Sequence, residues 1–347
     1  MSLNDKNISY LSSCKICGNT NLKNVIKLNE QYISATFVKS NKKNDLKKIK
    51  TPLTLSLCDQ SKKNNSCGHL QLYEIINPDL LYRQYFYRST TNDIMRKDLK
   101  NVVQSVLKIS RPKPKDIIVD IGSNDCTLLN FYKNNLKLVG FEPAQNIRFI
   151  DKGKNIKIFS NYFNANDFKK NFDQKAKVVT SCAMFYDLKN PKKFLKDILN
   201  ILDDNGIWCV QISYLLLMIK NLNFYDICHE HLSYYSIYSF ERLISQFNLK
   251  IFYAETNGVN GGSIRFYVCK KNCNKFDKEV FKKKLKNLRE NEKKYNLNKE
   301  KTFLNFQNKI DELKYKTNKY IDNILNKKEK VIALGASTKG NILLQQL

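Results

Sequence analysis

The sequence predicts an α/β protein built on a mostly parallel sheet that ends in an antiparallel hairpin. From Asp116 onward, short β-rich runs such as DIIVDIG, LKLVGFEP and AKVVTSCAMF alternate with helical patterns. Such alternation is typical of a parallel sheet covered by helices on both faces. The last two runs, LKIFYAETN and SIRFYVCK, are joined through GVNGG with no helix between them. We therefore expect them to pair antiparallel at one end of the sheet.

Length and charge narrow the class of protein. The chain has 347 residues, enough for two or more domains with buried cores. Its net charge of +28 comes mostly from scattered lysine, while arginine is scarce, so we expect a diffuse charge and not a nucleic-acid partner. The N-terminus lacks a signal sequence, and no apolar run reaches the roughly 18 residues of a membrane span. We expect a cytoplasmic monomer with reduced thiols and no membrane partner.

Composition shifts divide the chain into segments. Cysteine and turn residues gather at the N-terminus, RPKPK stops a helical pattern, and a later lysine-rich stretch has helical spacing. The final EKVIALGASTKGNILLQQL starts a strand, a glycine-rich turn and a helix, which cannot bury their own faces. We expect an N-terminal module (1–75), a helical bridge (76–110), a central α/β domain (111–272), a helical connector (273–329) and a partial α/β segment (330–347).

Four cysteines in the N-terminal module suggest a metal site. Cys14 and Cys17 form a C-x-x-C knuckle, and Cys58 and Cys67 form a second, wider pair. Four thiolates suit tetrahedral Zn²⁺, which stabilises modules whose own core is too small. His69 is a weaker candidate than Cys58, and the alternative is that Cys58 is a small buried hydrophobe and the C-x-x-C pair occurs by chance. A site with four protein ligands is closed, so we expect it to be structural.

The run VDIGSNDCTLL predicts a ligand-binding turn between a strand and a helix. Asp120 ends the strand, Gly122 permits a tight turn, and we expect backbone amides to face a ligand. Glu142, at the end of the next strand, can accept hydrogen bonds from both ribose hydroxyls of a nucleoside. The alternative is a turn that binds nothing.

The turn favours S-adenosylmethionine over a nicotinamide dinucleotide. It lacks the G-x-G-x-x-G that a pyrophosphate requires, and it carries the acidic Asp125. A sulfonium cation with an amino-acid tail tolerates that acid. Cys126 stands where the methyltransferase pattern D-x-G-x-x-x-G has its last glycine, which should crowd the turn slightly. The expected cofactor-binding residues are Asp120, Gly122, Ser123, Asn124, Asp125, Glu142, Pro143, Asn166, Asp167 and Ala183. Of these, Asn166 and Asp167 follow the third strand and are expected near the adenine of the cofactor.

The order of motifs resembles one known family. Cys-x-x-Cys, YRQYFYRST, IGSNDCTLL, GFEPAQNI, YDICHEHLSYYS, NGGSIRFYV and LGASTKGN resemble the sugar C-methyltransferases that modify nucleotide-linked 4-keto-deoxysugars. The resemblance covers essentially the whole chain. It implies a class I methyltransferase Rossmann-like sheet, a zinc-binding N-terminal module and a C-terminal Rossmann-like domain, which would begin near Lys330 and appear here truncated. It also implies S-adenosylmethionine as cofactor and a small-molecule nucleotide-sugar as substrate.

The residue types suit methylation of carbon. A carbon beside a ketone becomes nucleophilic only when a base removes its proton and its enolate oxygen is stabilised. We expect His231 to be that base, because imidazole titrates near neutral pH, with Glu230 either orienting it or taking the proton itself. Tyrosine hydroxyls can donate to the ketone oxygen. The expected catalytic residues are His231, Glu230, His229, Tyr85, Tyr87 and either Tyr234 or Tyr235.

Several alternatives stay open. Cys228 stands where many members of the family have tyrosine, and a thiol is a weak donor. The H-E-H stretch is also compatible with a metal pair or a plain polar loop, and YRQYFYRS with the core of an amphipathic helix. Arg265, after two glycines, is a candidate anion partner. At the level of function, the alternatives are an O- or N-methyltransferase and a non-catalytic or nucleic-acid-binding protein that retains the fold.

Overall fold

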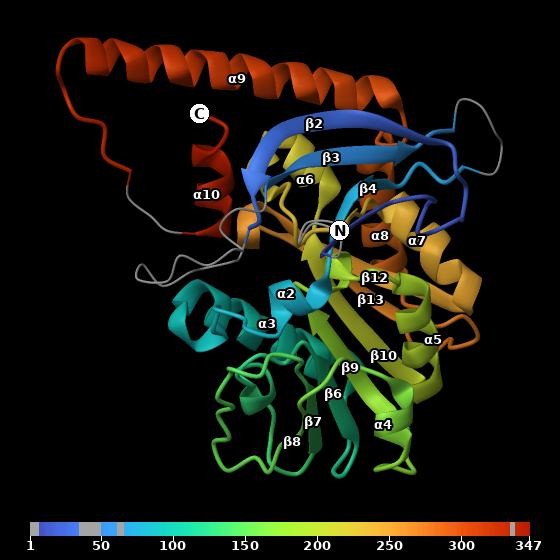
Figure 1. The fold of residues 1–347 in the computed structure, drawn as a ribbon. Coiled ribbons are helices and arrows are strands. Elements are labelled where there is room, and N and C mark those ends of the chain that lie inside the picture. Colours follow the sequence, from blue (N-terminus) through green and yellow to red (C-terminus); the bar gives the residue numbers. More distant parts are fainter. Residues whose placement is uncertain (1–6, 35–49, 61–65, 334–336) are drawn as a thin grey trace. The chain divides into compact units, whose positions relative to one another are not determined.

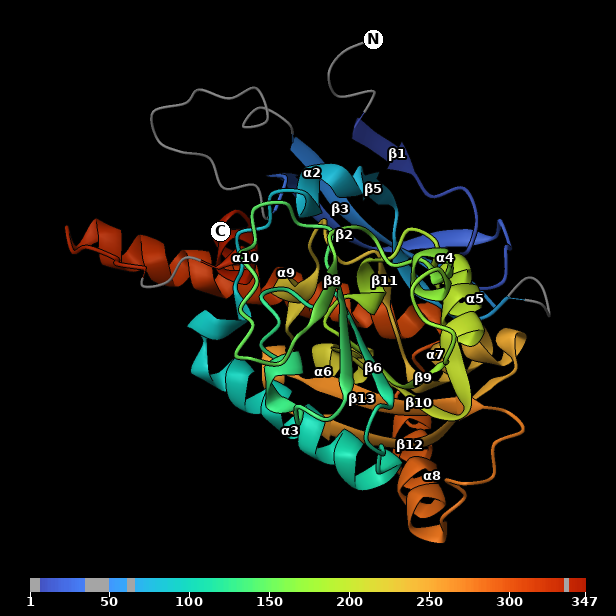
Figure 2. The ribbon, with the colours of Figure 1, turned by 90° about the horizontal axis from the view of Figure 1, so that it is seen from below.

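The computed structural model describes residues 7–34, 50–60, 66–333 and 337–347 (Figures 1 and 2). The chain divides into two compact units, and each draws on segments far apart along the chain. The first unit comprises Met1–Asn77, Leu215–Tyr234 and Tyr295–Leu347, and the second comprises Pro78–Tyr214 and Tyr235–Lys294.

A seven-stranded sheet forms the centre of the second unit. Its strand order is β12-β13-β10-β9-β6-β7-β8. Strands β10, β9, β6, β7 and β8 run parallel, whereas β13 is antiparallel to both β10 and β12. The strands are β6 (Ile117–Ile121), β7 (Lys137–Phe141), β8 (Lys157–Phe159), β9 (Ala176–Cys182), β10 (Leu202–Ser213), β12 (Leu249–Asn257) and β13 (Ser263–Lys270). The predicted parallel sheet with an antiparallel end hairpin is confirmed.

Most helices of the second unit pack against this sheet. In α3 the buried residues include Leu99, Val102, Val103 and Val106, which follow the i, i+3, i+4, i+7 spacing of one helical face. The helices are α2 (Pro78–Tyr82), α3 (Asp93–Ser110), α4 (Ala165–Lys169), α5 (Pro191–Ile201), α7 (Ile237–Ile244) and α8 (Glu279–Lys293), with short 3₁₀ turns η2 (Ser89–Thr91), η3 (Leu129–Phe131), η4 (Phe185–Asp187), η6 (Ser245–Phe247) and η7 (Val259–Gly261).

The expected helical bridge is interrupted between α2 and α3. Residues 83–88 are irregular, because their backbone groups have partners outside a helix. The Arg88 guanidinium donates to the carbonyls of Tyr85 (2.7 Å) and Tyr87 (3.1 Å), and the Asn146 side chain bonds both the N–H and the C=O of Tyr85. The Asn92 side chain then caps a new helix. A helical core for YRQYFYRS is therefore wrong.

One buried carboxylate binds the two places where the second unit connects to Leu215–Tyr234, a segment of the first unit. Glu292 of α8 accepts a hydrogen bond from the Tyr214 hydroxyl (2.8 Å), at the end of β10. It also accepts from the backbone N–H groups of Ile237 (2.7 Å) and Tyr238 (3.0 Å), which begin α7. These bonds satisfy two of the N–H groups that every helix start leaves without an intrahelical partner.

The first unit contains a smaller sheet and a long helix. The sheet has the order β11-β4-β3-β2, and β1 pairs with β5. Helix α9 lies along β2 in Figure 1, where Gln307 accepts a hydrogen bond from the Lys27 N–H (2.9 Å). The elements are β1 (Ile8–Tyr10), β2 (Leu22–Tyr32), β3 (Lys50–Cys58), β4 (Leu70–Leu72), β5 (Glu74–Ile76), β11 (Ser233–Tyr234), α6 (Leu215–Lys220), η5 (Phe224–Asp226), α9 (Glu300–Asn326) and α10 (Thr338–Leu344).

The C-terminal segment differs from its sequence-based expectation. Residues 329–333 form no strand, although they read as one, because they pair with no other strand of the described chain. The glycine-rich turn at 334–336 lies outside the described residues. The expected helix is present as α10, where the Ser337 hydroxyl accepts from the Gly340 N–H (3.0 Å).

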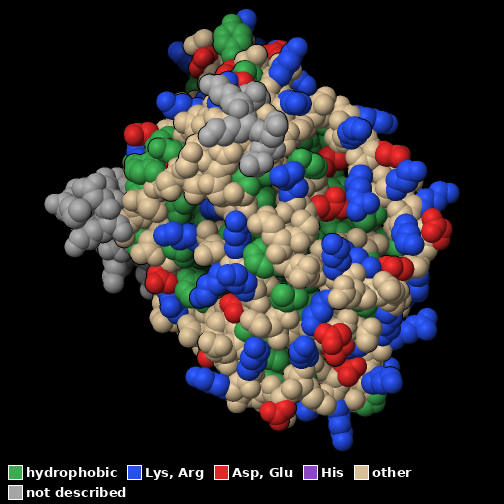
Figure 3. Space-filling view, turned by 90° about the vertical axis from the view of Figure 1, so that its right-hand side faces the viewer, with side chains coloured by type: hydrophobic (Ala, Val, Ile, Leu, Met, Phe, Trp, Pro, Cys, Tyr) green, Lys and Arg blue, Asp and Glu red, His purple; other side chains and the backbone are tan. Residues whose placement is uncertain are grey.

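The surface carries its positive charge in a scattered pattern. On the face shown in Figure 3, Lys and Arg side chains are spread over the whole surface with Asp and Glu among them. A basic stripe, the usual footprint of a nucleic-acid-binding face, is not seen on this face. Among the described residues no helix is both long and apolar enough to span a membrane.

Arg265 on β13 is buried and paired with two carboxylates. Only 1% of its side chain is exposed, and its guanidinium forms ion pairs with Asp98 (3.1 Å) and Glu255 (3.0 Å). Gln211 accepts from its Nε (2.9 Å) and donates to the other Asp98 oxygen (2.6 Å). The expected role of Arg265 as an anion partner is therefore wrong: it links α3 to the sheet.

We predict that Arg265→Met destabilises the second unit by about 3–5 kcal/mol, because it leaves the Asp98 carboxylate buried without its cation. The matched control is Arg96→Met, which breaks the exposed Arg96–Asp93 pair (3.4 Å) and should cost less than about 1 kcal/mol. Trp208, the one tryptophan of the chain, is fully buried in β10 and reports unfolding of this unit by fluorescence in urea. Equal losses in the two variants would contradict the prediction.

Candidate functional site

The backbone N–H groups of the turn after β6 form hydrogen bonds within the protein. Gly122 has a φ of 71°, and the N–H groups of Gly122 (2.9 Å) and Ser123 (3.1 Å) both donate to the Phe141 carbonyl. The N–H of Asn124 donates to Glu142 (2.8 Å), and that of Cys126 donates to the Ser123 carbonyl (2.9 Å). The expectation that these amides face a ligand is therefore wrong for these four residues.

This arrangement separates two kinds of cofactor. Pyrophosphate binding at a strand-to-helix turn depends on a row of N–H groups directed at the phosphate. The four donors at residues 122, 123, 124 and 126 are instead used inside the protein. A ligand here must be held by side chains and carboxylates, which suits a cationic nucleoside better than a dinucleotide.

Two residues of the turn adopt a left-handed backbone without being glycine. Asn124 has a φ of 51° and Cys126 a φ of 66°. Asparagine tolerates this conformation, whereas for most other side chains it costs roughly 1–2 kcal/mol. Glycine, which the pattern D-x-G-x-x-x-G has at this position, would avoid the cost. The Cys126 side chain, 1% exposed, packs into the core instead of crowding the turn.

Glu142 is held firmly where it follows β7. Its two oxygens accept from the N–H groups of Asn124 (2.8 Å) and Ala144 (2.9 Å), and 6% of the residue is exposed. Burial raises the pKa of this carboxyl, while the two N–H bonds lower it. Each carboxylate oxygen keeps a second lone pair, so Glu142 can also accept hydrogen bonds from a pair of ribose hydroxyls. Pro143 lies between Glu142 and Ala144.

Asp120 and Ala183 stand at the carboxyl edge of the same sheet. The Thr180 hydroxyl donates to Asp120 (2.6 Å), whose pKa is raised to about 7, first by burial and further by the negative charge of Glu142. A ligand cation nearby would offset the free-energy cost of burying the ionised carboxylate. Ala183, just after β9, has a φ of 53°, a strained conformation that is frequent at functional sites.

The side chains of Asn124 and Asp125 hold the irregular bridge onto the turn. Asn124 accepts from the Ser89 N–H (3.0 Å) and donates to the Tyr87 carbonyl (3.1 Å). Asp125 accepts from the N–H and hydroxyl of Thr90 and from those of Thr127. These residues therefore position the turn, a role that their sequence did not indicate.

Tyr87 leaves a hydroxyl available beside this turn. Its Oη is buried and makes no hydrogen bond within the described chain, and burial raises its pKa. A buried polar atom of this kind normally has a partner, which here a ligand can supply. Tyr85 lies on the same irregular segment, where its backbone is bonded to Asn146.

The two residues expected near the adenine lie on α4. Asn166 is exposed, and Asp167 accepts from the Asn164 side chain (2.7 Å) at the start of that helix. The Asp167 contact is a helix-capping one, and the adenine role of both residues stays a prediction.

His229 has both ring nitrogens engaged inside the first unit. Its Nδ1 accepts from the Ser34 N–H (3.1 Å), so its Nε2 carries the proton and donates to the Thr51 carbonyl (3.4 Å). The ring is fully buried, which lowers its pKa to about 4. These contacts argue against the catalytic role expected for His229 and indicate that it anchors the segment to β3.

His231 has the opposite tautomer. Its Nδ1 lies 2.8 Å from the Asp226 carbonyl, which can only accept, so Nδ1 carries the proton and Nε2 keeps its lone pair. Burial and the charge of Lys339 lower its pKa to about 3. A neutral imidazole follows, which is a hydrogen-bond acceptor but a weak base.

Glu230 has the pKa that proton transfer requires. It is 7% exposed, and burial raises its pKa to about 7. Tyr234, in β11, is buried as well. Glu230, His229, His231 and Tyr234 belong to the first unit, whereas Tyr85, Tyr87 and the expected cofactor-binding residues belong to the second.

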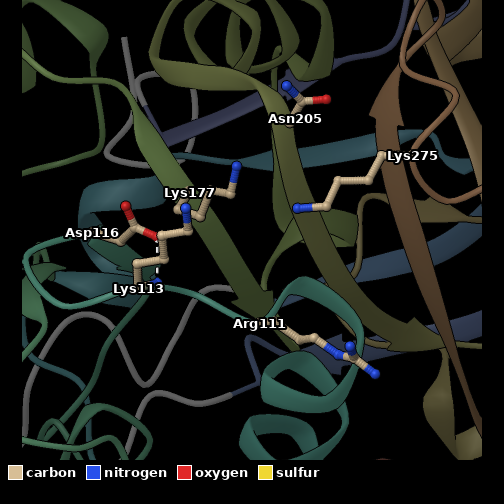
Figure 4. A pocket seen from close by; sticks show the side chains of 6 residues that line it. All are labelled: Arg111, Lys113, Asp116, Lys177, Asn205 and Lys275. Carbon is tan, nitrogen blue, oxygen red and sulfur yellow. Dashed lines mark hydrogen bonds between the residues drawn. The ribbon is translucent and has the colours of Figure 1, made fainter.

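A cavity of about 400 Å³ lies elsewhere on the second unit, at the amino ends of β6 and β9 (Figure 4). It is lined by Arg111, Lys113, Asp116, Lys177, Asn205 and Lys275. In a parallel sheet the amino ends lie opposite the carboxyl ends, where ligands bind in α/β folds. This cavity is therefore not the site of Asp120 and Glu142.

Cys14, Cys17, Cys58 and Cys67 form a four-thiolate cluster in the first unit. All their sulfur atoms lie within 4.8 Å of one another, with Cys14 and Cys67 at 3.4 Å and Cys17 and Cys58 at 3.5 Å. Gly18, with a φ of 75°, completes the knuckle turn. Among the described residues this is the one group of three or more candidate metal ligands, and it does not include His229 or His231. The soft, tetrahedral donor set fits Zn²⁺.

We predict one zinc per chain, measured by elemental mass spectrometry of the purified protein. Cys58→Ser should lose the metal and unfold the cysteine module, because a structural site requires all four ligands. Cys273→Ser, in the other unit, is the matched control and should keep it. His69→Gln should also retain zinc, since the cluster consists of cysteines alone; loss of zinc there would make His69 a ligand.

Comparisons with known families cover nearly the whole chain. Residues 14–82 match a "Putative zinc binding domain", residues 92–254 a "Methyltransferase domain" and residues 258–347 a "C-methyltransferase C-terminal domain". The C-methyltransferase NovU of Streptomyces niveus is 22% identical over 257 residues, which is 73% of this chain and 60% of that protein. The chain thus aligns with less than two thirds of that relative's length.

Solved structures resemble about half of the chain. A S-adenosylmethionine-dependent methyltransferase from Clostridium acetobutylicum is 13% identical and covers 51% of this chain and 92% of that chain, with a TM-score of 0.42. The magnesium protoporphyrin IX methyltransferase ChlM from Synechocystis, solved with bound SAH, is 9% identical and covers 52% and 88%, with a TM-score of 0.39.

The three family matches follow one another along the chain in the order zinc-binding, methyltransferase and C-methyltransferase C-terminal domain. The four-cysteine cluster lies within the first of these matches, and the five parallel strands β6 to β10 lie within the second. The chain therefore belongs to the S-adenosylmethionine-dependent C-methyltransferase family.

Proposed function

We propose that this chain transfers the methyl group of S-adenosylmethionine to a carbon beside the ketone of a nucleotide-linked keto-deoxysugar. The observation that carries the cofactor assignment is the turn after β6, whose amides are used internally while Glu142 stays fixed beside it. The acceptor class is supported by the sequence resemblance and by the printed name of the relative, a C-methyltransferase.

In this proposal the second unit binds the cofactor. Glu142 accepts from the ribose hydroxyls, and Asp120 lies where it can offset the positive charge of the amino-acid portion. S-adenosylmethionine, when bound, supplies an electrophilic methyl group on a sulfonium. The buried hydroxyl of Tyr87 donates to the ketone oxygen, where negative charge develops as the enolate forms.

Glu230 is the proposed general base, in preference to His231. A base is most effective when its pKa lies near the working pH, and the pKa of Glu230 is about 7 while that of His231 is about 3. Glu230 takes the proton from the carbon beside the ketone, and the electron pair of that C–H bond moves into the enolate. The enolate carbon then forms the new C–C bond as the C–S bond to the methyl group breaks.

His231 serves as a hydrogen-bond acceptor for the substrate. Its tautomer places the lone pair on Nε2, so it can accept from a sugar hydroxyl but cannot donate there. The cysteine cluster holds zinc as a closed structural site. Because zinc ligation needs reduced thiols and all ten cysteines are free, we place the protein in the cytoplasm.

We predict that Glu142→Gln weakens binding of S-adenosylmethionine about ten- to a hundredfold, because hydrogen bonds to a charged group are replaced by weaker ones. Isothermal titration calorimetry measures this loss. Asp116→Asn, at the opposite edge of the sheet, is the matched control and should bind as the unmodified chain does. No saturable binding by the unmodified chain would refute the proposed function itself.

We predict that mixing candidate TDP-linked keto-deoxysugars with labelled cofactor gives a product with one labelled methyl on carbon, detected by mass spectrometry. In D₂O without cofactor, the unmodified chain should exchange the proton beside the ketone. Glu230→Gln should slow this exchange about a hundred- to ten-thousandfold. The unmodified rate should fall as pH drops through about 7, because Glu230 then becomes protonated.

The control for that experiment is Glu241→Gln, a half-buried acid on α7 of the second unit that pairs with Arg289. It should exchange the proton normally and keep the same pH profile. Methyl transfer to oxygen or nitrogen, without proton exchange at carbon, would show an O- or N-methyltransferase instead.

A further inference from the structure

An ion pair with a buried carboxylate joins the C-terminal helix of the first unit to the segment that carries His231. Lys339, the second residue of α10, pairs with the carboxylate of Asp226, the last residue of η5. The Asp226 side chain is 3% exposed and that of Lys339 is 30% exposed. The pair is thus formed by a carboxylate that has almost no access to water and a cation that reaches it from the surface.

The backbone of Asp226 holds the imidazole of His231. The Asp226 carbonyl lies 2.8 Å from Nδ1 of His231, which fixes the Nδ1–H tautomer. One residue therefore has its carboxylate bound to Lys339 and its carbonyl bound to His231. Movement of Asp226 in response to loss of Lys339 would move the acceptor of the His231 proton.

Local hydrogen bonds make this link stiff. The Asp226 N–H donates to the Asn223 carbonyl (3.0 Å), and the Ile227 N–H donates to the Phe224 carbonyl (3.0 Å). The His231 N–H donates to the Cys228 carbonyl (3.1 Å), so the chain turns between Asp226 and the imidazole. In such a turn the carbonyl direction at Asp226 depends on where its own side chain is held.

Burial makes the carboxylate sensitive to its cation. Burial raises the pKa of Asp226, and Lys339 lowers it again. A buried carboxylate that loses its partner becomes protonated or moves toward water, because an unpaired charge in the interior is strongly unfavourable. Either response changes the geometry of η5, five residues before His231.

We propose that Lys339 and Asp226 are positioning residues, which hold His231 as the Nδ1–H tautomer with an unprotonated Nε2. The importance of that tautomer for the reaction rests on the proposed function, in which Nε2 accepts a substrate hydroxyl. The tautomer itself does not rest on it, since it is a property of the free protein. Lys339 lies in the sequence motif LGASTKGN, but no spacing rule indicates its role from the sequence.

The experiment measures the tautomer of His231 by NMR of protein labelled with ¹⁵N-histidine. The chain has three histidines, so His231→Gln identifies the signal by its disappearance. We expect His231 to show a protonated Nδ1 and His229 a protonated Nε2, which makes the two rings an internal comparison. Zinc content and calorimetric cofactor binding establish that each variant is folded.

Lys339→Met should shift the His231 signals toward a mixture of tautomers while those of His229 stay unchanged. Lys314→Met is the matched control, because Lys314 contacts the C-terminal segment through Gln346 (3.0 Å) and should leave His231 unchanged. Asp226→Asn combined with Lys339→Met removes both charges and should restore the tautomer at least in part. Unchanged His231 signals in folded Lys339→Met would overturn the proposal.

Proton exchange separates this inference from the proposed function. If Lys339→Met changes the tautomer and raises the KM for the sugar with little change in kcat, the positioning role and the proposed function are both supported. If the tautomer changes while KM and proton exchange stay as in the unmodified chain, the positioning holds and the role given to His231 in the proposed function fails.

Discussion

The geometry of the cofactor turn depends on the buried carboxylate of Glu142. Because it accepts hydrogen bonds from the N–H groups of Asn124 and Ala144, it joins the turn after β6 to the end of β7. The Phe141 carbonyl completes the link by accepting from Gly122 and Ser123. Because these donors are used inside the protein, the turn is shaped before a ligand arrives, and what remains for the ligand is acceptor capacity.

A second layer of contacts makes the turn part of a larger structure. The bridge segment after α2 gives up helical hydrogen bonds, and its backbone is bound instead by Asn124, Asp125, Arg88 and Asn146. The irregular backbone brings the Tyr87 hydroxyl to a buried position where it has no hydrogen-bond partner among the described residues. In a regular helix these residues would form their backbone hydrogen bonds with one another. The side chains of Asn124 and Asp125 would then lack these hydrogen-bond partners.

Burial divides the roles within the H-E-H stretch. Burial makes the imidazoles of His229 and His231 neutral, so each tautomer is set by a neighbouring group. The neighbour is the N–H of Ser34 for His229 and the carbonyl of Asp226 for His231. The same burial has the opposite effect on Glu230, whose pKa rises toward neutral pH. Residues that look equivalent in sequence thus become an anchor, an acceptor and a candidate base.

The sequence by itself determined the sheet and the metal ligands. Strand-like runs, their alternation with helical patterns and the spacing of Cys14, Cys17, Cys58 and Cys67 are local features, and local features follow from period and side-chain chemistry. The positions of Asp120 and Glu142 at strand ends could be predicted for the same reason.

Only the tertiary structure decided how the polar groups pair. The burial of Arg265 against Asp98, the tautomer of His229 and the contact of Lys339 with Asp226 join residues far apart in the chain. The break in the bridge and the tautomer of His231 depend in the same way on the folded backbone. A hydrogen bond or ion pair of this kind leaves no periodic trace in sequence. Its energy depends on exclusion of water, which exists only once the chain has folded.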